Sequence, residues 1–338
     1  MQLKLHPLKL ALKRPFTITY GTFHYREALV VELIDQGLSG FGEATAISYY
    51  GKNIADFIAV LETHRNFIEQ CTFAHPSELH QKLSPYLQDF PFVQCALDVA
   101  AYDLWAKRME VPLYKALNLS TENLIVSNFT IGIDTIPQMV EQIQATNFPI
   151  YKIKLGTPQD IAIIEALRNY TDAIFRVDAN GAWTVEETLQ NAKKLKKLGV
   201  EFIEQPLAKD NWEGMKEVYR HSVLPIMADE SCQIPADIAR CHQHFHGVNI
   251  KLMKCGGITP ALKMIAAAKA LGLKVMLGCM TESSIGISAI AHLSPLLDYV
   301  DMDGALLLAN DPAIGVRIEK GKIVFSDGNG LGAFLVTS

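Results

Sequence analysis

The chain has 338 residues, of which 49% are hydrophobic and 20% charged, and its formal net charge is −5 at pH 7. This length suits one large domain with a smaller module, and the composition allows a sizeable buried core. Acidic and basic residues are mixed along the whole chain, which argues against a nucleic-acid surface with its clustered Lys and Arg.

Neither cysteine usage nor the amino-terminal residues point to export. The six cysteines form no CxxC pair, so we expect free thiols in a reducing compartment. Lys4, His6, Lys9 and Lys13 interrupt the first apolar residues, which leaves no apolar region of a signal peptide. No apolar run is long enough to span a bilayer. We expect a soluble, cytoplasmic protein without a membrane partner, and a homo-oligomer.

The first hundred or so residues predict strands followed by helices. Residues 29–33 are typical of a strand, and the segment IDQGLSGFGEA after it predicts a turn into a second strand. Helical patterns cover 54–70, 75–87 and 92–108, the last with apolar residues at helical spacing. This order predicts an α+β module.

From about residue 123 the sequence alternates between short β-rich runs and helical stretches such as 185–198 and 260–271. Eight such runs, seven intervening helices and a repeat of roughly 25 residues predict consecutive βα units. Both a closed parallel barrel and an open doubly wound sheet fit this pattern. The β-rich runs cover 124–133, 150–155, 173–177, 200–203, 224–227, 248–252, 273–277 and 299–302.

Polar residues occur at the carboxyl ends of the predicted strands, whose other residues are apolar. In a barrel these ends converge on one mouth, whereas an open sheet spreads them along an edge. The pattern therefore favours a barrel with an active site at its mouth. From the second strand to the eighth, these polar residues include Lys152, Lys154, Asp178, Glu204, Asp229, Lys251, Thr281, Asp301 and Asp303.

Asp178, Glu204 and Asp229 follow three successive strands. Three carboxylates gathered in one place repel one another unless a cation lies between them. A hard divalent ion meets this need, and Mg²⁺ keeps coordination positions open for substrate oxygens. The alternative is three separate surface acids paired with Lys or Arg, which their occurrence in successive units disfavours. We therefore predict a Mg²⁺ site.

Lys154 and Lys251 flank the three acids in strand order, so in a barrel their amines face each other across the metal. Lys152 points the same way as Lys154, and its ammonium is expected to lower the pKa of Lys154 toward the range of a general base. Mg²⁺ and Lys152 would stabilise the enediolate that forms when a proton α to a carboxylate is removed. One lysine would remove the proton and the other would deliver one to the opposite face, which predicts racemisation or epimerisation.

The motifs around these residues resemble the enolase superfamily, in its muconate-lactonizing-enzyme subgroup. The matching segments are KIKLG, RVDANGAW, EQPL, ADES and IKLMKCGGI, with ALDVAAYDLWAKRMEVPLYKALN before them. The resemblance implies a (β/α)7β modified TIM barrel at 121–314. It also implies an N-terminal α+β capping domain at 1–120, completed by residues 315–338. For the site it implies Mg²⁺ bound by Asp178, Glu204 and Asp229, with Lys154 and Lys251 as the two bases.

Within the subgroup the sequence most resembles dipeptide epimerases of the Ala-Glu type, which implies inversion of the C-terminal residue of an L-Ala-L-Xaa dipeptide. The feature that carries this resemblance is the pair Asp301 and Asp303. Alternate strand residues face one side, so both carboxylates can hold the ammonium of a free dipeptide. N-acyl substrates carry no such cation. The alternative for Asp303 is a cap of the turn at Gly304.

Epimerases of the Ala-Glu type read the glutamate with an Arg on a mobile loop of the cap, and the matching position here is Gly21. Tyr20 and Phe23 flank it, and the nearest Arg is Arg26, close to the strand or within it. An aromatic, uncharged lid suits an apolar side chain. We therefore predict a small or hydrophobic Xaa rather than Glu, with Tyr50 on a second lid loop.

Other residues at strand ends are expected to contact the substrate, namely Thr130, Cys279, Met280 and Thr281. Other reactions on the same scaffold stay open, namely those of N-acylamino acid racemase, o-succinylbenzoate synthase and muconate cycloisomerase. A lyase would need only one of the two lysines as a base. A non-catalytic binding protein with this fold is a remote alternative, against which the complete set of acids and lysines argues.

Overall fold

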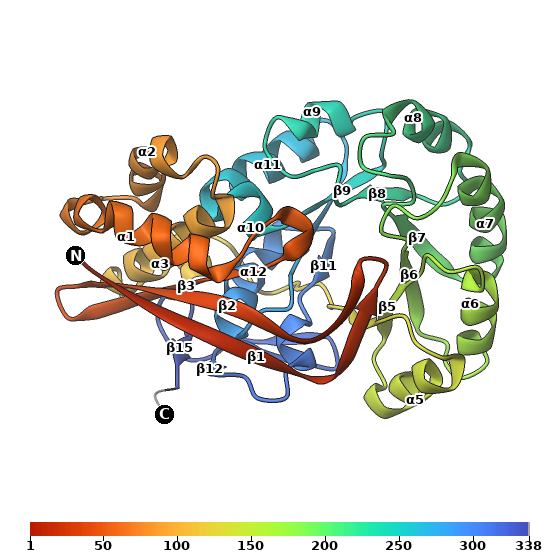
Figure 1. The fold of residues 1–338 in the computed structure, drawn as a ribbon, viewed down its shortest axis with the longest axis horizontal. Coiled ribbons are helices and arrows are strands. Elements are labelled where there is room, and N and C mark those ends of the chain that lie inside the picture. Colours follow the sequence, from red (N-terminus) through yellow and green to blue (C-terminus); the bar gives the residue numbers. More distant parts are fainter. Residues whose placement is uncertain (337–338) are drawn as a thin grey trace.

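The amino-terminal part of the protein is built on a three-stranded antiparallel sheet. The computed structural model describes residues 1–336, and the sheet consists of β1 (Gln2–Ile18), β2 (Gly21–Asp35) and β3 (Leu38–Thr45). β1 and β2 form a long ribbon that crosses the barrel (Figure 1). The sequence pattern predicts only 29–33 of this ribbon as strand. β1 lacks a clear signal because most of its side chains are partly or fully exposed, so no regular apolar alternation marks it.

Three helices pack with this sheet: α1 (Ile54–Gln70), α2 (Pro76–Leu87) and α3 (Pro91–Arg108). The helical patterns in the sequence locate each of them to within one residue. α3 is buried along most of its length and contacts β3 on one side and the barrel on the other. Its close approach to β3 requires glycine, because a Cβ at Gly42 would lie 2.0 Å from the carbonyl oxygen of Ala96.

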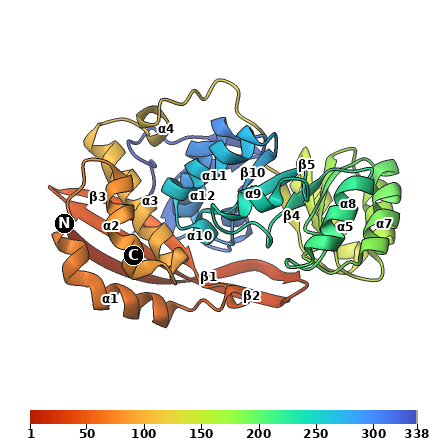
Figure 2. The same cartoon turned by 90° about the horizontal axis from the view of Figure 1, so that it is seen from above.

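The barrel is an eight-stranded parallel sheet whose strands follow one another in chain order. Helices surround it, and the N-terminal helices lie at one end of the molecule, from which the ribbon of β1 and β2 extends toward the barrel (Figure 2). The expected TIM-type barrel with a capping domain is confirmed. Its strands are β4 (Phe129–Ile131), β5 (Ile150–Lys154), β6 (Ile174–Asp178), β7 (Val200–Glu204), β8 (Ile226–Ala228), β9 (Gly247–Ile250), β10 (Lys274–Gly278) and β11 (Tyr299–Asp301).

Helices connect the strands as the repeat predicts, with one difference. Between β9 and β10 the expected single helix is divided in two, because Gly256 and Gly257 adopt φ angles of +96° and +119° and end the first helix. The barrel helices are α5 (Ile136–Thr146), α6 (Asp160–Arg168), α7 (Val185–Lys197), α8 (Trp212–His221), α9 (Asp237–Cys241), α10 (Leu252–Cys255), α11 (Ile258–Ala270) and α12 (Ser284–Leu293).

Side chains, rather than a strand ladder, join the first and last barrel strands. The Asn128 amide donates to Asp301 over 2.7 Å, and the backbone N–H of Met302 donates to the Ser127 hydroxyl over 3.1 Å. β4 and β11 are the two ends of the sheet order. The barrel therefore closes at the strand that carries Asp301.

Buried acids of the N-terminal part fix it to the barrel and to the last residues. Asp98 on α3 accepts hydrogen bonds from the backbone and hydroxyl of Thr259, both over 2.8 Å. Asp103 accepts the backbone N–H of Leu331 over 2.7 Å, so the C-terminal segment with β12 (Ala313–Ile314), β13 (Arg317–Glu319), β14 (Lys322–Val324) and β15 (Phe334–Leu335) returns to α3. Within residues 1–336, every helix is too short or too polar to cross a membrane.

Candidate active site

A cavity lies where the carboxyl ends of the barrel strands face the β1–β2 ribbon and the short helix η1 (Ser48–Tyr50). Its barrel side is mostly charged, and its cap side is mostly aromatic and aliphatic. Most of the residues predicted for the site line it: Tyr20, Phe23, Tyr50, Thr130, Lys152, Lys154, Asp229, Lys251, Cys279, Met280, Thr281, Asp301 and Asp303. Gly21 does not line it. It forms the hairpin turn after Tyr20, with φ at +138°.

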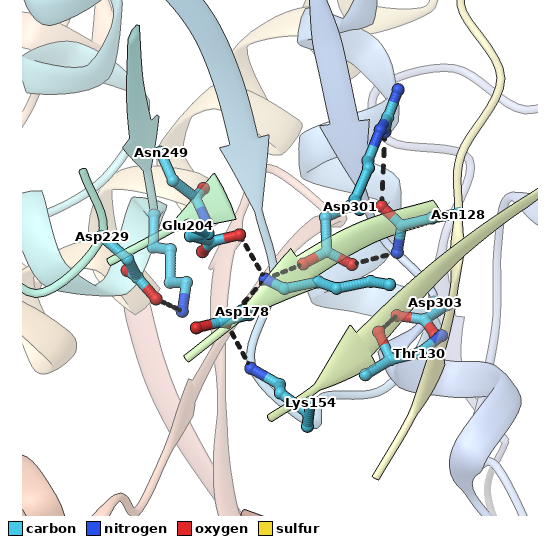
Figure 3. A network of polar contacts seen from close by, with 12 residues as sticks. Asn128, Thr130, Lys154, Asp178, Glu204, Asp229, Asn249, Asp301 and Asp303 are labelled. Carbon is cyan, nitrogen blue, oxygen red and sulfur yellow. Dashed lines mark hydrogen bonds and ion pairs between the residues drawn. The ribbon is translucent and has the colours of Figure 1, made fainter. Parts of the chain in front are cut away.

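The three acids predicted as metal ligands come together at the floor of this cavity. Asp178 ends β6, Glu204 ends β7, and Asp229 follows β8. One carboxylate oxygen of each lies within 4.8 Å of the others, and all three side chains are buried. Figure 3 shows the three carboxylates pointing toward one another. Hard oxygen donors in this arrangement suit Mg²⁺.

Lys152 lies in the middle of the acidic groups. Its Nζ is 2.8 Å from Glu204, 2.9 Å from Asp301 and 3.2 Å from Asp178. Burial alone would lower the pKa of Lys152, but the carboxylates, Asp301 first, raise it well above its usual value. Lys152 is therefore a buried, charged group whose desolvation the surrounding carboxylates compensate.

Lys154 and Lys251 contact the two outer members of the acidic row. Lys154 Nζ lies 2.6 Å from Asp178 (Figure 3), and Lys251 Nζ lies 2.7 Å from Asp229. Since Asp178 ends β6 and Asp229 follows β8, with Glu204 on the strand between them, the amines approach the row from its opposite ends. This is the arrangement that proton transfer on two faces of one carbon requires.

The pKa values of the three acids depend on burial and on the neighbouring amines. Burial alone would raise the pKa of Asp229, yet Lys251 and Lys254 hold it well below its usual value. Burial likewise opposes ionisation of Asp178, and Lys154 and Lys152 hold its pKa low. Burial raises the pKa of Glu204 to about 7. In this structure the lysines thus compensate the charges of Asp178 and Asp229, whereas Glu204 is compensated less.

Lys254 is a site residue that no pattern in the sequence indicates. Its fully buried ammonium donates to the Asp229 carboxylate and to the Asp229 backbone carbonyl, each over 2.6 Å. It stands three residues after Lys251, in the helix α10. Because α10 follows the strand directly, it turns Lys254 back beneath Asp229. The contacts make Lys254 a positioning residue for this acid.

Asp301 and Asp303 both line the cavity, and one oxygen of each lies within 4.8 Å of the other. Burial opposes ionisation of Asp301, but Lys152 and the Asn128 hydrogen bond lower its pKa to about 2. Asp303 accepts the backbone N–H and the hydroxyl of Thr130. Burial and the charge of Asp301 raise the pKa of Asp303 to about 7. Asp303 precedes the short helix η3 (Gly304–Leu307), and its side chain makes no capping hydrogen bond, so the alternative role as a turn cap is wrong.

The lid differs in detail from the prediction. Tyr20 reaches across to the barrel, where its hydroxyl donates to the Asn180 carbonyl over 2.9 Å and lies 3.3 Å from Glu230. Its ring stacks on Tyr49, with 4.2 Å between centroids.

Asn180 and Glu230 are further cavity residues without a predicted role. They are part of the segments RVDANGAW and ADES, two and one residues after the predicted ligands. The amide of Asn180 donates to Glu230 over 3.2 Å. Their position in those segments is the signal that could have identified them. Their contact with Tyr20 depends on the tertiary approach of the ribbon.

Two family models match the chain. The one described as "Mandelate racemase / muconate lactonizing enzyme, N-terminal domain" matches residues 2–117, and the one described as "Enolase C-terminal domain-like" matches residues 136–336. An L-Ala-D/L-amino acid epimerase of Flavobacterium johnsoniae is 52% identical over 336 residues, which cover 99% of this chain and 100% of the relative.

Solved structures agree. A substrate complex of the L-Ala-D/L-Glu epimerase from Bacillus subtilis superposes with a TM-score of 0.94 at 28% identity, covering 100% of this chain and 99% of that one. A dipeptide epimerase from Enterococcus faecalis V583, complexed with Mg and L-Leu-L-Tyr, gives 0.92 at 32% identity and 98% coverage of both chains. The chain therefore belongs to the mandelate racemase and muconate lactonizing enzyme family of the enolase superfamily.

Proposed function

We propose that this protein is a dipeptide epimerase, which inverts the α-carbon of the C-terminal residue of L-Ala-L-Xaa dipeptides. The observation that carries the proposal is the approach of Lys154 and Lys251 to opposite ends of the acidic row. The names of the relatives support it, since those proteins are epimerases of dipeptides or of L-Ala-amino acid substrates. The proposed barrel at 121–314 and cap at 1–120 with 315–338 both contribute to the cavity.

We propose Mg²⁺ as the cofactor, held by Asp178, Glu204 and Asp229. Their buried oxygens lie close enough together to share one ion, and oxygen-only ligands suit Mg²⁺. When bound, the ion supplies positive charge to the substrate carboxylate, where negative charge grows as the α-proton leaves. The Enterococcus structure, which holds Mg and a dipeptide, supports this assignment.

The lysines perform the proton transfers in this proposal. Lys154 and Lys251 each hydrogen-bond one of the three acids, and both side chains line the cavity in which the substrate would bind. One amine removes the α-proton and the other returns one to the opposite face, so the configuration inverts. Lys152 remains between Glu204 and Asp301, where its fixed charge stabilises the growing negative charge on the substrate.

Asp301 and Asp303 would hold the substrate ammonium at the other end of the cavity. Asp301 already bonds Lys152 and Asn128, so Asp303 has the less compensated charge. An ammonium beside Asp303 offsets the burial and the repulsion by Asp301 that raise its pKa to about 7. An N-acyl substrate brings no such cation, and for this reason we do not propose acylamino acid racemisation.

Replacing Asp303 by Asn is expected to raise KM for L-Ala-L-Leu by roughly 10- to 100-fold, because a hydrogen bond to a charged group is lost. The pH dependence should change as well. With the pKa of Asp303 at about 7, the wild type binds the dipeptide more weakly as pH falls through 7. In Asp303→Asn this dependence should be weaker but not absent, because Glu204 and Glu230 still titrate there. KM measured from pH 6 to 8 tests both effects.

The control for this experiment is Asp327→Asn, at an exposed carboxylate remote from the cavity. Its KM and its pH profile should equal those of the wild type. An Asp303→Asn variant with unchanged KM at all pH values would contradict the placement of the ammonium.

We further propose that Xaa is small or hydrophobic. The cap side of the cavity offers Phe16, Ile18 and Ile47 to this side chain, and apolar walls bind apolar groups. Incubation in deuterated water with L-Ala-L-Val, L-Ala-L-Leu and L-Ala-L-Ala should replace the α-proton of the second residue and produce the L,D epimer, as followed by proton NMR. Exchange with no dipeptide, but with an N-acylamino acid, would overturn the proposed function.

A further inference from the structure

Arg26 is a buried cation in the wall of the cavity that the proposed reaction does not use. It stands on β2, opposite Leu10 of β1, and only 8% of its surface is exposed. Its guanidinium carbon lies over the ring of Phe23, 3.4 Å from the centroid. Both side chains line the cavity. The N–H groups of the guanidinium are therefore available to a ligand in the cavity.

Arg26 has no anionic or hydrogen-bonding partner among residues 1–336. None of their carboxylates forms an ion pair with it, and its buried Nε lacks an acceptor. Arg176, the other buried arginine of these residues, bonds Glu201 over 2.7 Å. Burial lowers the pKa of Arg26 to about 10, which leaves it charged at neutral pH. A buried, charged and unpaired group is costly unless a ligand pairs with it.

The position of Arg26 indicates which part of a dipeptide it would meet. Near Arg26 the ribbon adjoins the last two barrel strands, since the Thr45 hydroxyl donates to the Thr281 carbonyl and Leu12 forms a β-bridge with Leu308. Asp301 and Asp303 lie on this side of the barrel, whereas the three acids proposed to hold Mg²⁺ lie at the ends of β6, β7 and β8. Arg26 therefore lies on the side proposed for the N-terminal residue.

We propose that Arg26 forms a subsite for a side-chain carboxylate on the N-terminal residue of the dipeptide. The inference rests on the proposed function, because Asp301 and Asp303 must hold the ammonium of that residue. A carboxylate matches the fork of a guanidinium with two parallel hydrogen bonds and compensates its charge, which a peptide carbonyl cannot do. The substrate class then includes dipeptides that begin with Asp or Glu, in addition to those that begin with Ala.

The test compares acid and amide at one position within the same variant, so a general loss of activity cancels. kcat/KM is measured for L-Glu-L-Leu and L-Gln-L-Leu, and for L-Ala-L-Glu and L-Ala-L-Gln. In the wild type the acid-to-amide ratio at the N-terminal position should be about tenfold or more, as for a charge-assisted hydrogen bond. Arg26→Met should reduce this ratio to about one, and Arg26→Lys should restore part of it.

Arg240→Met is the matched control, because the Arg240 guanidinium also stacks on an aromatic ring, 4.1 Å from the centroid of Trp212, but lies outside the cavity. Its ratios should equal those of the wild type. Three results would overturn the inference. Arg26→Met could leave the acid-to-amide ratio of kcat/KM at the N-terminal position unchanged, or it could change this ratio at the C-terminal position alone. It could also lower kcat/KM equally for the acid and the amide. If L-Ala-L-Leu exchanges normally, such a result leaves the proposed function standing. If no dipeptide exchanges, both fail.

Discussion

Replacing either Lys154 or Lys251 by Gln should abolish epimerisation, with kcat reduced by about 10²- to 10⁴-fold, the contribution of a positioned general base. The two variants should differ in what they retain. Each keeps one amine, which approaches the substrate from one end of the acidic row. One variant should therefore still exchange the α-proton of the L,L dipeptide with solvent, and the other that of the L,D epimer. Proton NMR in deuterated water, starting from each pure epimer, measures this.

A control for the lysine variants is Lys193→Gln, on the exposed face of α7, which should epimerise both substrates at the wild-type rate. Two results would contradict the two-base arrangement. One is exchange of the same epimer by both lysine variants, and the other is full epimerisation by either of them. Thermal unfolding of each variant establishes that the lost rate does not reflect a lost fold.

Replacing Glu204 by Gln should remove Mg²⁺ binding and lower kcat by about 10³-fold or more, since a metal of this kind contributes several kcal/mol to the transition state. Glu204 is the central acid of the three, and its side chain is fully buried. In the wild type, Mg²⁺ should raise the midpoint of thermal unfolding, because a ligand that binds only the folded state stabilises it. The Glu204→Gln variant should show neither this increase nor heat of binding in a calorimetric titration.

The matched control for the metal prediction is Glu201→Gln, at the opposite end of the same strand, β7, where the carboxylate pairs with Arg176 over 2.7 Å. Its affinity for Mg²⁺ should equal that of the wild type. A Glu204→Gln variant that binds Mg²⁺ with unchanged affinity would show that the three acids do not form the metal site.

The barrel was predictable because charges at the ends of apolar strands have few explanations other than a shared mouth. Asp178 and Glu204 end, and Asp229 follows, strands whose other residues are mostly buried, so their convergence follows from the repeat. β1 was not predictable in this way. Most of its residues are at least partly exposed, and β2 fixes its register, so only the tertiary pairing reveals it as a strand.

The same distinction holds for the site. Strand order alone places Lys154 and Lys251 on either side of the acids, but it does not reveal that Lys152 bonds Asp301, which lies 149 residues away in the sequence. Arg26 has no local pattern that marks it. We assign it a role because it has no ion-pair or hydrogen-bond partner, and only the folded structure reveals this. The prediction of an uncharged lid around Gly21 therefore describes the cavity only in part, because the cation Arg26 also lines it.

The most direct measurement is a crystal structure with Mg²⁺ and L-Ala-L-Leu bound. The account predicts that the α-carbon of the leucine lies between Lys154 Nζ and Lys251 Nζ, each about 3–3.5 Å away, as reacting groups must be, and on opposite faces of that carbon. An α-carbon with both amines on one face, or three acids that do not share the ion, would contradict it.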